Sequence, residues 1–349
     1  MKLTMEFDGF FSLSVLNRIS TAMTVIHHHE LSDTIFLDFS MIEGWDPAAL
    51  LWLIIGLKHF REQDFFVRLK LPDPSDMKFQ RSANYLMRWN FDRALERVDR
   101  LDNILIDEQI GYFNKNLNYY RPSNRGGEEV LSNRLLQFCD LSQDNHEGID
   151  SNKINYFIKA FSESQLDNIV NVKTSFTKEQ EYRFVHNILS EGLKNTKDHP
   201  NASFGMAVAS VLGRTNELIL AIADNGESIC STILNAYNEY NNISLTPEWY
   251  NDAISFENID NNIDTIRDVL DFATKEGITS KPDDHEGMGL FYLKQDTLNS
   301  FIKPGKLRIL SSSIQIIYDS DNMKTPSVQK WYTSWKGNLL RVSIPLKSK

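Results

Sequence analysis

Hydrophobic and polar positions in the first hundred residues follow an alternation of strands and helices. A dense run of β-branched and aromatic residues from Thr34 to Ser40 predicts a buried strand, and a second run spans Phe65 to Leu71. Between them, Asp46-Pro47 is typical of a helix start, because aspartate caps a first turn and proline suits its first position. Another helix is predicted over Met77 to Arg97. This order indicates a small α/β domain at residues 1–100.

Residues 101–180 are more polar and rich in Asn and Asp. Helical periodicity appears in Val130–Phe138 and again in Ile154–Phe161. The sequence therefore predicts a helical connector over residues 101–164, which packs on a second domain formed by residues 165–349.

The second domain is organised around the stretch from Glu181 to His199. Helical spacing places Phe184 and Ile188, with Leu189 beside them, on an apolar side. Glu191 and Asn195 are four residues apart, so a helix stacks the carboxylate above the carboxamide. The same pair is common on ordinary solvated helix faces, and its meaning depends on the motifs that follow.

Two further motifs follow a strand or open a helix. Ser203–Gly213 and Glu217–Ala223 predict a hairpin whose second strand runs into Asp224-Asn225-Gly226. This tripeptide either places a carboxylate at the floor of a pocket or forms an ordinary turn. Gly287-Met288-Gly289 opens a helix, where glycines let backbone N–H groups approach a phosphate. Three more strands are expected, two of them over residues 306–318 and one near the C-terminus.

Composition limits the classes of function. The 349 residues suffice for two domains with cores of their own, and a net charge of −10 argues against nucleic acid as the main ligand. No apolar run approaches the roughly 18 residues that span a membrane, and the N-terminal residues lack a signal-peptide layout, so a cytoplasmic protein without a membrane partner is expected. The two cysteines, Cys139 and Cys230, have neither disulfide-framework nor metal-ligand spacing.

The motifs of the second half, taken in order, resemble the GHKL ATPase domain. They are Glu191 and Asn195 on a helix, Asp224-x-Gly226 after a strand, Gly287-x-Gly289 opening a helix, and a last strand after Lys336-Gly337-Asn338. The superfamily includes the DNA gyrase B subunit, MutL, sensor histidine kinases and anti-sigma-factor serine kinases, and the segment 191–199 is most similar to the last group. The resemblance covers about residues 165–347 and implies an α+β two-layer sandwich, the Bergerat ATP-binding fold.

The resemblance implies ATP and Mg²⁺ as ligands. Asn195 would hold Mg²⁺ through its carbonyl oxygen, with the metal bridging phosphate oxygens. Glu191, one turn earlier, would orient or deprotonate the attacking water or hydroxyl. His199 is expected to be a structural residue at the helix end, and Lys294 to lie on the solvated side of its helix.

The remaining motifs would bind the base and the phosphates. Asp224 would accept a hydrogen bond from the adenine amino group, with Gly226 leaving space for the base. Gly287 and Gly289 would bring backbone donors to the phosphates, and residues 230–286 would form a lid. The chain departs from the family at Ser228, which replaces the second glycine of the Asp-x-Gly-x-Gly motif.

The N-terminal stretch resembles STAS domains, the anti-sigma-factor antagonist fold. Asp38, Ser40, Asp46 and Leu50 fall in register with that family's strand-turn-helix signature. The family's phosphoacceptor serine falls at residue 47 or 48, where this chain has proline and alanine. The resemblance therefore implies a STAS-like domain that binds a protein partner and is not regulated by phosphorylation at the helix start.

The leading hypothesis is an ATP-binding regulatory protein that hydrolyses Mg-ATP slowly or transfers phosphate to a partner, as a protein-serine kinase does. One alternative is a binding module that senses ATP without turnover. Another is an ATP-gated effector or clamp of a bacterial stress or antiviral system, which forms a homodimer on ATP. Glu191 favours turnover, because adenine and Mg²⁺ recognition do not require it. A conventional histidine kinase is not expected, since no dimerisation helix with a phosphoacceptor histidine is identified.

Overall fold

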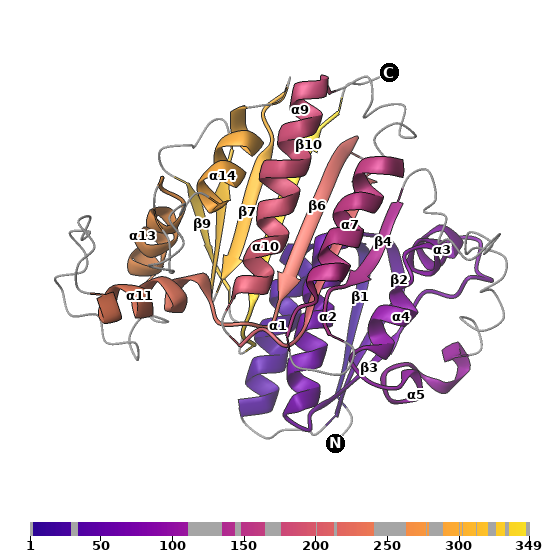
Figure 1. Ribbon diagram of the computed structural model, residues 1–349. Helices are drawn as coiled ribbons and strands as arrows, with labels where there is room; N and C mark the ends of the chain where they lie inside the picture. The colour runs from indigo at the N-terminus through magenta and orange to yellow at the C-terminus, as the bar shows by residue number, and fades with distance from the viewer. Residues whose placement is uncertain are drawn as a thin grey trace.

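The computed structural model describes most of the chain in segments. These are residues 3–28, 34–110, 135–143, 148–164, 176–199, 201–212, 215–240, 263–276, 278, 289–299, 301, 303–311, 313–319, 326–331 and 335–346. Within them the protein has a mixed α/β structure with one parallel and one antiparallel sheet (Figure 1). The expectation that the protein is built from both helices and strands is confirmed.

The parallel sheet is built from the N-terminal residues. Its strands, in spatial order, are β1 (Leu3–Phe11), β2 (Thr34–Trp45) and β3 (Phe66–Lys70). Helices α1 (Leu13–His28) and α2 (Pro47–Glu62) connect them. As predicted, Asp46 caps α2, since its Oδ1 accepts from the backbone N–H of Ala48 at 2.9 Å.

The helix predicted over residues 77–97 is divided in two. It forms α3 (Gln80–Arg88) and α4 (Phe91–Glu96), and the short α5 (Leu101–Ile104) follows. The break falls at Asn90, whose φ of 55° is left-handed and cannot continue a right-handed helix. Asparagine tolerates this conformation better than most residues, so the break has a local cause.

Within the described residues, the antiparallel sheet has seven strands in the order β4-β5-β6-β10-β7-β8-β9. They are β4 (Leu135–Asp140), β5 (Gly205–Leu212), β6 (Glu217–Asp224), β7 (Lys306–Ser311), β8 (Ile314–Tyr318), β9 (Ser327–Lys330) and β10 (Asn338–Pro345). The helix predicted at residues 130–138 is wrong over residues 135–138, which belong to β4 and pair with β5. A short apolar run does not distinguish a helix from a strand, and here the pairing with β5 stabilises the strand conformation.

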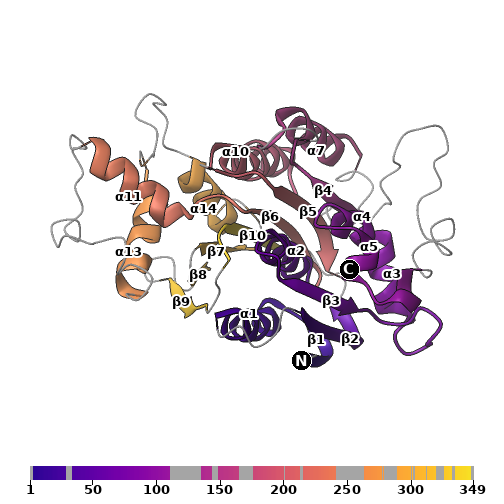
Figure 2. The same cartoon turned by 90° about the horizontal axis from the view of Figure 1, so that it is seen from below.

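Helices cover one face of this sheet (Figures 1 and 2). They are α7 (Ser151–Ser164), the continuous helix of α9 (Lys178–Arg183), η1 (Phe184–Ser190) and α10 (Glu191–Asp198), and α14 (Gly289–Asn299). Beside them lie α11 (Ile229–Tyr240) and α13 (Ile263–Ala273). The predicted helix at 181–199 is therefore present, with a π-helical centre, and Phe184, Ile188 and Leu189 are buried as expected.

The opposite face of the large sheet is covered by α2, which lies between the two sheets (Figure 2). Every residue from Pro47 to Leu57 is buried, because apolar surfaces contact this helix from both sides. Gly56 lets the indole of Trp335 approach, since a Cβ at this position would lie 2.9 Å from the ring. The N-terminal unit, which comprises the parallel sheet with α1 and α2, thus shares one apolar core with the seven-stranded sheet.

A buried ion pair joins α2 to the centre of the large sheet. Arg341 on β10 lies 3.2 Å from Asp46, and their side chains are 7% and 10% exposed. Arg341 also donates to the hydroxyl of Ser343. Burial, with the nearby Arg341 charge adding to it, lowers the pKa of Arg308, which stands opposite Arg341 on β7. The start of α2 is therefore enclosed between the parallel and the antiparallel sheet.

Among the helices of the described residues, none combines the length and the apolar character that a membrane crossing requires.

Candidate functional site

The structure places Gly289, the first residue of α14, against the predicted acid and amide of α10. A Cβ on Gly289 would lie 3.2 Å from Oε2 of Glu191 and 3.3 Å from Oδ1 of Asn195. Contacts this close are tighter than most Cβ contacts, so a larger residue would have to displace the Glu191 and Asn195 side chains and glycine suits the position. The other carboxylate oxygen of Glu191 pairs with Lys194 at 2.7 Å. Glu191 and Asn195 thus face the N-terminus of α14.

A second polar group lies across three neighbouring strands of the sheet. Asp224 ends β6, Asn338 begins β10 and Ser311 ends β7, and the antiparallel register sets Asn338 opposite both others. Side chains directly opposite on neighbouring strands share a face of the sheet. All three are at most 2% exposed. The ends of these strands therefore form a buried polar row.

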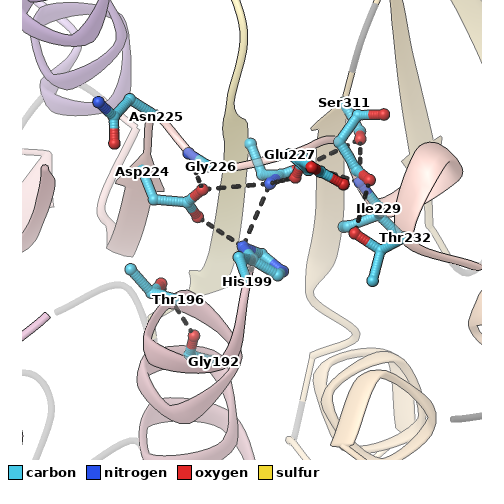
Figure 3. Close-up of polar contacts among 12 residues, drawn as sticks. Gly192, Thr196, His199, Asp224, Asn225, Gly226, Glu227, Ile229, Thr232 and Ser311 are labelled. Atoms are coloured by element: carbon cyan, nitrogen blue, oxygen red, sulfur yellow. Dashed lines mark hydrogen bonds and ion pairs between the residues drawn. The ribbon is translucent and has the colours of Figure 1, made fainter. Parts of the chain in front are cut away.

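The carboxylate of Asp224 is engaged from three sides (Figure 3). Nδ1 of His199 lies 2.8 Å from Oδ2. The backbone N–H of Gly226 donates to Oδ1 at 3.0 Å, and the amide of Asn338 donates to the same oxygen at 3.2 Å. His199 directly follows α10, four residues after Asn195, so the end of that helix delivers the imidazole to the end of β6.

Two glycines permit this close packing. A Cβ at Gly226 would lie 3.1 Å from the Cβ atoms of both His199 and Ala202, so the end of α10 fills the space beside this glycine. Gly337 has a φ of 124°, and a Cβ there would collide with the backbone carbonyl of Asp224. Only glycine adopts this conformation without strain, which lets β10 begin alongside the end of β6.

The predicted site residues fall into two groups joined by one helix. Glu191, Asn195 and Gly289 form the first, and Asp224 with Gly226 forms the second, reached from Asn195 through His199. Gly287 lies outside the described residues. Asn338 and Ser311 were not predicted, although a polar residue at the end of an apolar strand is a signal that could have found them.

The first group suits Mg²⁺ carried on a phosphate. Mg²⁺ keeps several waters and is commonly held by one or two protein oxygens together with substrate phosphates. The amide nitrogen of Asn195 is buried and has no hydrogen-bond partner within the described part of the chain. Among the described residues, no group of three or more His, Cys, Asp and Glu side chains could hold a metal by itself. The residues that face the start of α14, one amide oxygen and one carboxylate, are of the kind that hold Mg²⁺ together with a phosphate.

Lys294 is not on the solvated side of its helix, so that expectation is wrong. Its side chain is 13% exposed, and its ammonium lies 4.1 Å from the centre of the Tyr318 ring. It also donates to Asp271 at 3.3 Å and to Thr274 at 3.1 Å. Burial raises the pKa of the Tyr318 phenol, which donates to the same Asp271. The lysine therefore links α14 to α13 and β8.

Replacing Lys294 tests this link. Lys294→Met keeps the aliphatic stem but removes the cation from the Tyr318 ring and from Asp271. We expect a loss of about 1–3 kcal/mol in the free energy of unfolding, measured in urea. Lys306→Met, whose ammonium lies 3.9 Å from Asp319 and whose side chain is half exposed, serves as the control. Equal stability of the two variants would contradict a structural role for Lys294.

The sequence matches no protein-family model, and a search of curated proteins found no match.

Proposed function

We propose that the chain binds Mg-ATP between α10, the N-terminus of α14 and the end of β6, as a regulatory ATPase or protein-serine kinase of the GHKL type. The proposal includes a Bergerat-type fold for residues 165–349 and a STAS-like fold for residues 1–100. The observation that carries it is the contact of Gly289 with both Glu191 and Asn195. Residues about ninety positions apart in the sequence lie together there, and their proximity supports a common site.

Each group has a chemical part in this proposal. Asn195 would hold Mg²⁺ through Oδ1, and the metal would offset phosphate charge. Backbone N–H groups at the start of α14 suit the phosphates, because the N-terminus of a helix favours anions. Glu191 is 27% exposed in its side chain, so it can receive a water or a hydroxyl and take up its proton. The base would lie toward Asp224.

The N-terminal unit is proposed to bind a protein partner. The start of α2 is an unsuitable contact for that partner, because Pro47 and Ala48 are buried and Asp46 is paired with Arg341. A partner would therefore use another surface of the unit. The same enclosure supports the expectation that the start of α2 is not phosphorylated.

Glu191→Ala separates binding from turnover. We expect the variant to bind Mg-ATP with an affinity within about threefold of wild type, because Glu191 contacts neither the base nor the metal in this proposal. Turnover of radiolabelled ATP is expected to fall on the order of 10²-fold or more, since a positioned base contributes that much. Label is followed into free phosphate and into protein, which distinguishes hydrolysis from phosphoryl transfer.

Glu181→Ala, on the same continuous helix but at α9, is the matched control and should turn over ATP like wild type. Undiminished turnover in Glu191→Ala would remove the proposed role of this carboxylate. Tight binding without any turnover in wild type would favour the ATP-sensing module, and ATP-dependent doubling of the mass in solution would favour the dimerising effector.

A further inference from the structure

Asp224 is poorly placed to contact a base directly. The residue is 2% exposed. Oδ1 already accepts from Gly226 and Asn338, and Oδ2 faces His199. The side chain of His199 is 10% exposed, whereas that of Asp224 is 2% exposed. The imidazole is therefore more accessible to a ligand than the carboxylate that it contacts.

The hydrogen bonds around Asn338 fix which ring nitrogen of His199 carries the proton. The amide oxygen of Asn338 accepts from the backbone N–H of Ile229 at 3.0 Å and from the Ser311 hydroxyl at 2.8 Å. This orientation leaves its nitrogen to donate both hydrogens, one to Asp224 and one to the Glu227 carbonyl at 2.8 Å.

A carboxylate only accepts hydrogen bonds, so the 2.8 Å approach of Nδ1 to Oδ2 of Asp224 requires a proton on Nδ1, and the 3.1 Å approach of the Asn338 nitrogen to Nδ1 is then a contact between two donors. The proton on Nδ1 therefore goes to Oδ2 of Asp224. In a neutral imidazole with its proton on Nδ1, the other nitrogen, Nε2, is an acceptor. No partner for Nε2 occurs among the described residues, and the two ring nitrogens point in different directions.

We propose that His199 reads the base of the nucleotide, with Nε2 accepting a hydrogen bond from an exocyclic amino group and Asp224 acting as the positioning residue. This inference rests on the proposed function and deepens it. Adenine carries an amino group at its 6 position, whereas hypoxanthine carries a carbonyl there. Nε2 is an acceptor, so it would pair with the amino group of adenine but would face another acceptor in the carbonyl of hypoxanthine. The site should therefore prefer ATP to inosine triphosphate.

The test is a competition between ATP and inosine triphosphate in the full chain, with Mg²⁺ present. Wild type is expected to prefer ATP by about tenfold or more, since an unpaired polar contact is a strong basis for discrimination. In His199→Ala, both nucleotides should bind with similar affinity, because the metal and phosphate contacts remain.

Asp224→Asn gives the sharper result and keeps the shape of the site. The amide oxygen of the new side chain must take the position that accepts from Gly226 and Asn338. Its amide nitrogen then faces Nδ1 of His199 and donates a hydrogen bond to that ring nitrogen. The proton of the imidazole then moves to Nε2, which becomes a donor. We expect the preference to invert toward inosine triphosphate, with the melting temperature reported alongside to show that the variant folds.

The possible results separate the two proposals. If wild type binds neither nucleotide, both the proposed function and the role of His199 are overturned. If wild type prefers ATP and Asp224→Asn retains the same preference, only the role of His199 is overturned. An inverted preference in Asp224→Asn would support it, because a purely structural histidine would not change which base is favoured.

Discussion

Asn195→Ala is expected to weaken Mg-ATP binding by about 100-fold or more. The carboxamide supplies the only protein oxygen proposed to hold the metal, and even groups that merely support metal ligands commonly change affinity 10- to 100-fold. The amide nitrogen of Asn195 has no partner within the described part of the chain, so the substitution breaks no hydrogen bond there. Stability should therefore change by less than about 1 kcal/mol. Calorimetric titration with Mg-ATP measures the loss.

The same titration in EDTA isolates the metal. Without Mg²⁺, wild type and Asn195→Ala are expected to bind ATP with equal affinity, because the difference between them is the metal contact. Asn299→Ala is the matched control, since Asn299 is an exposed residue at the far end of α14 that bonds to Gln295. Equal affinity of wild type and Asn195→Ala for Mg-ATP would reject the site.

Arg341→Met is expected to lower the free energy of unfolding by about 3–5 kcal/mol. Methionine approximates the length of the arginine stem, but it leaves the buried carboxylate of Asp46 without its cation, and an uncompensated buried charge is costly. Chemical denaturation in urea measures the loss. Arg100→Met is the control, because the Arg100 and Asp102 side chains are 79% and 47% exposed and the change should stay within about 0.5 kcal/mol.

A double variant identifies the unpaired charge as the cause. Asp46→Asn keeps an N-cap for α2, because asparagine caps helices as well as aspartate does. Combined with Arg341→Met, it removes the carboxylate that would be left alone, so the double variant should be more stable than Arg341→Met by itself. A further loss of stability in the double variant would show that packing, and not charge, explains the effect.

The side chains on the two faces of strand β10 make different contacts. Asn338 belongs to the polar row beside His199, while Leu340 and Val342 continue the apolar core under the helices. Arg341, on the opposite face, holds the start of α2. Successive side chains of a strand alternate between faces, so one short segment serves both the candidate site and the N-terminal unit.

Local signals accounted for much of the secondary structure. The Asp46-Pro47 helix start, the hairpin of β5 and β6 and the beginning of α14 depend on capping, turn and glycine chemistry within a few residues. Where such signals were short or ambiguous, prediction was wrong or incomplete. Residues 135–138 form a strand because they pair with the edge of β5. Strand β9 was not predicted.

The sequence by itself determined which residue types are available and which lie on one helix face, including Glu191 above Asn195. Only the tertiary structure decided what those side chains meet. Gly289 reaches Glu191 and Asn195 because α14 packs on α10, and Asn338 reaches Asp224 because β10 inserts between β6 and β7. These contacts join residues about a hundred positions apart, and the packing that joins them is a property of the whole core, so no local pattern could specify them.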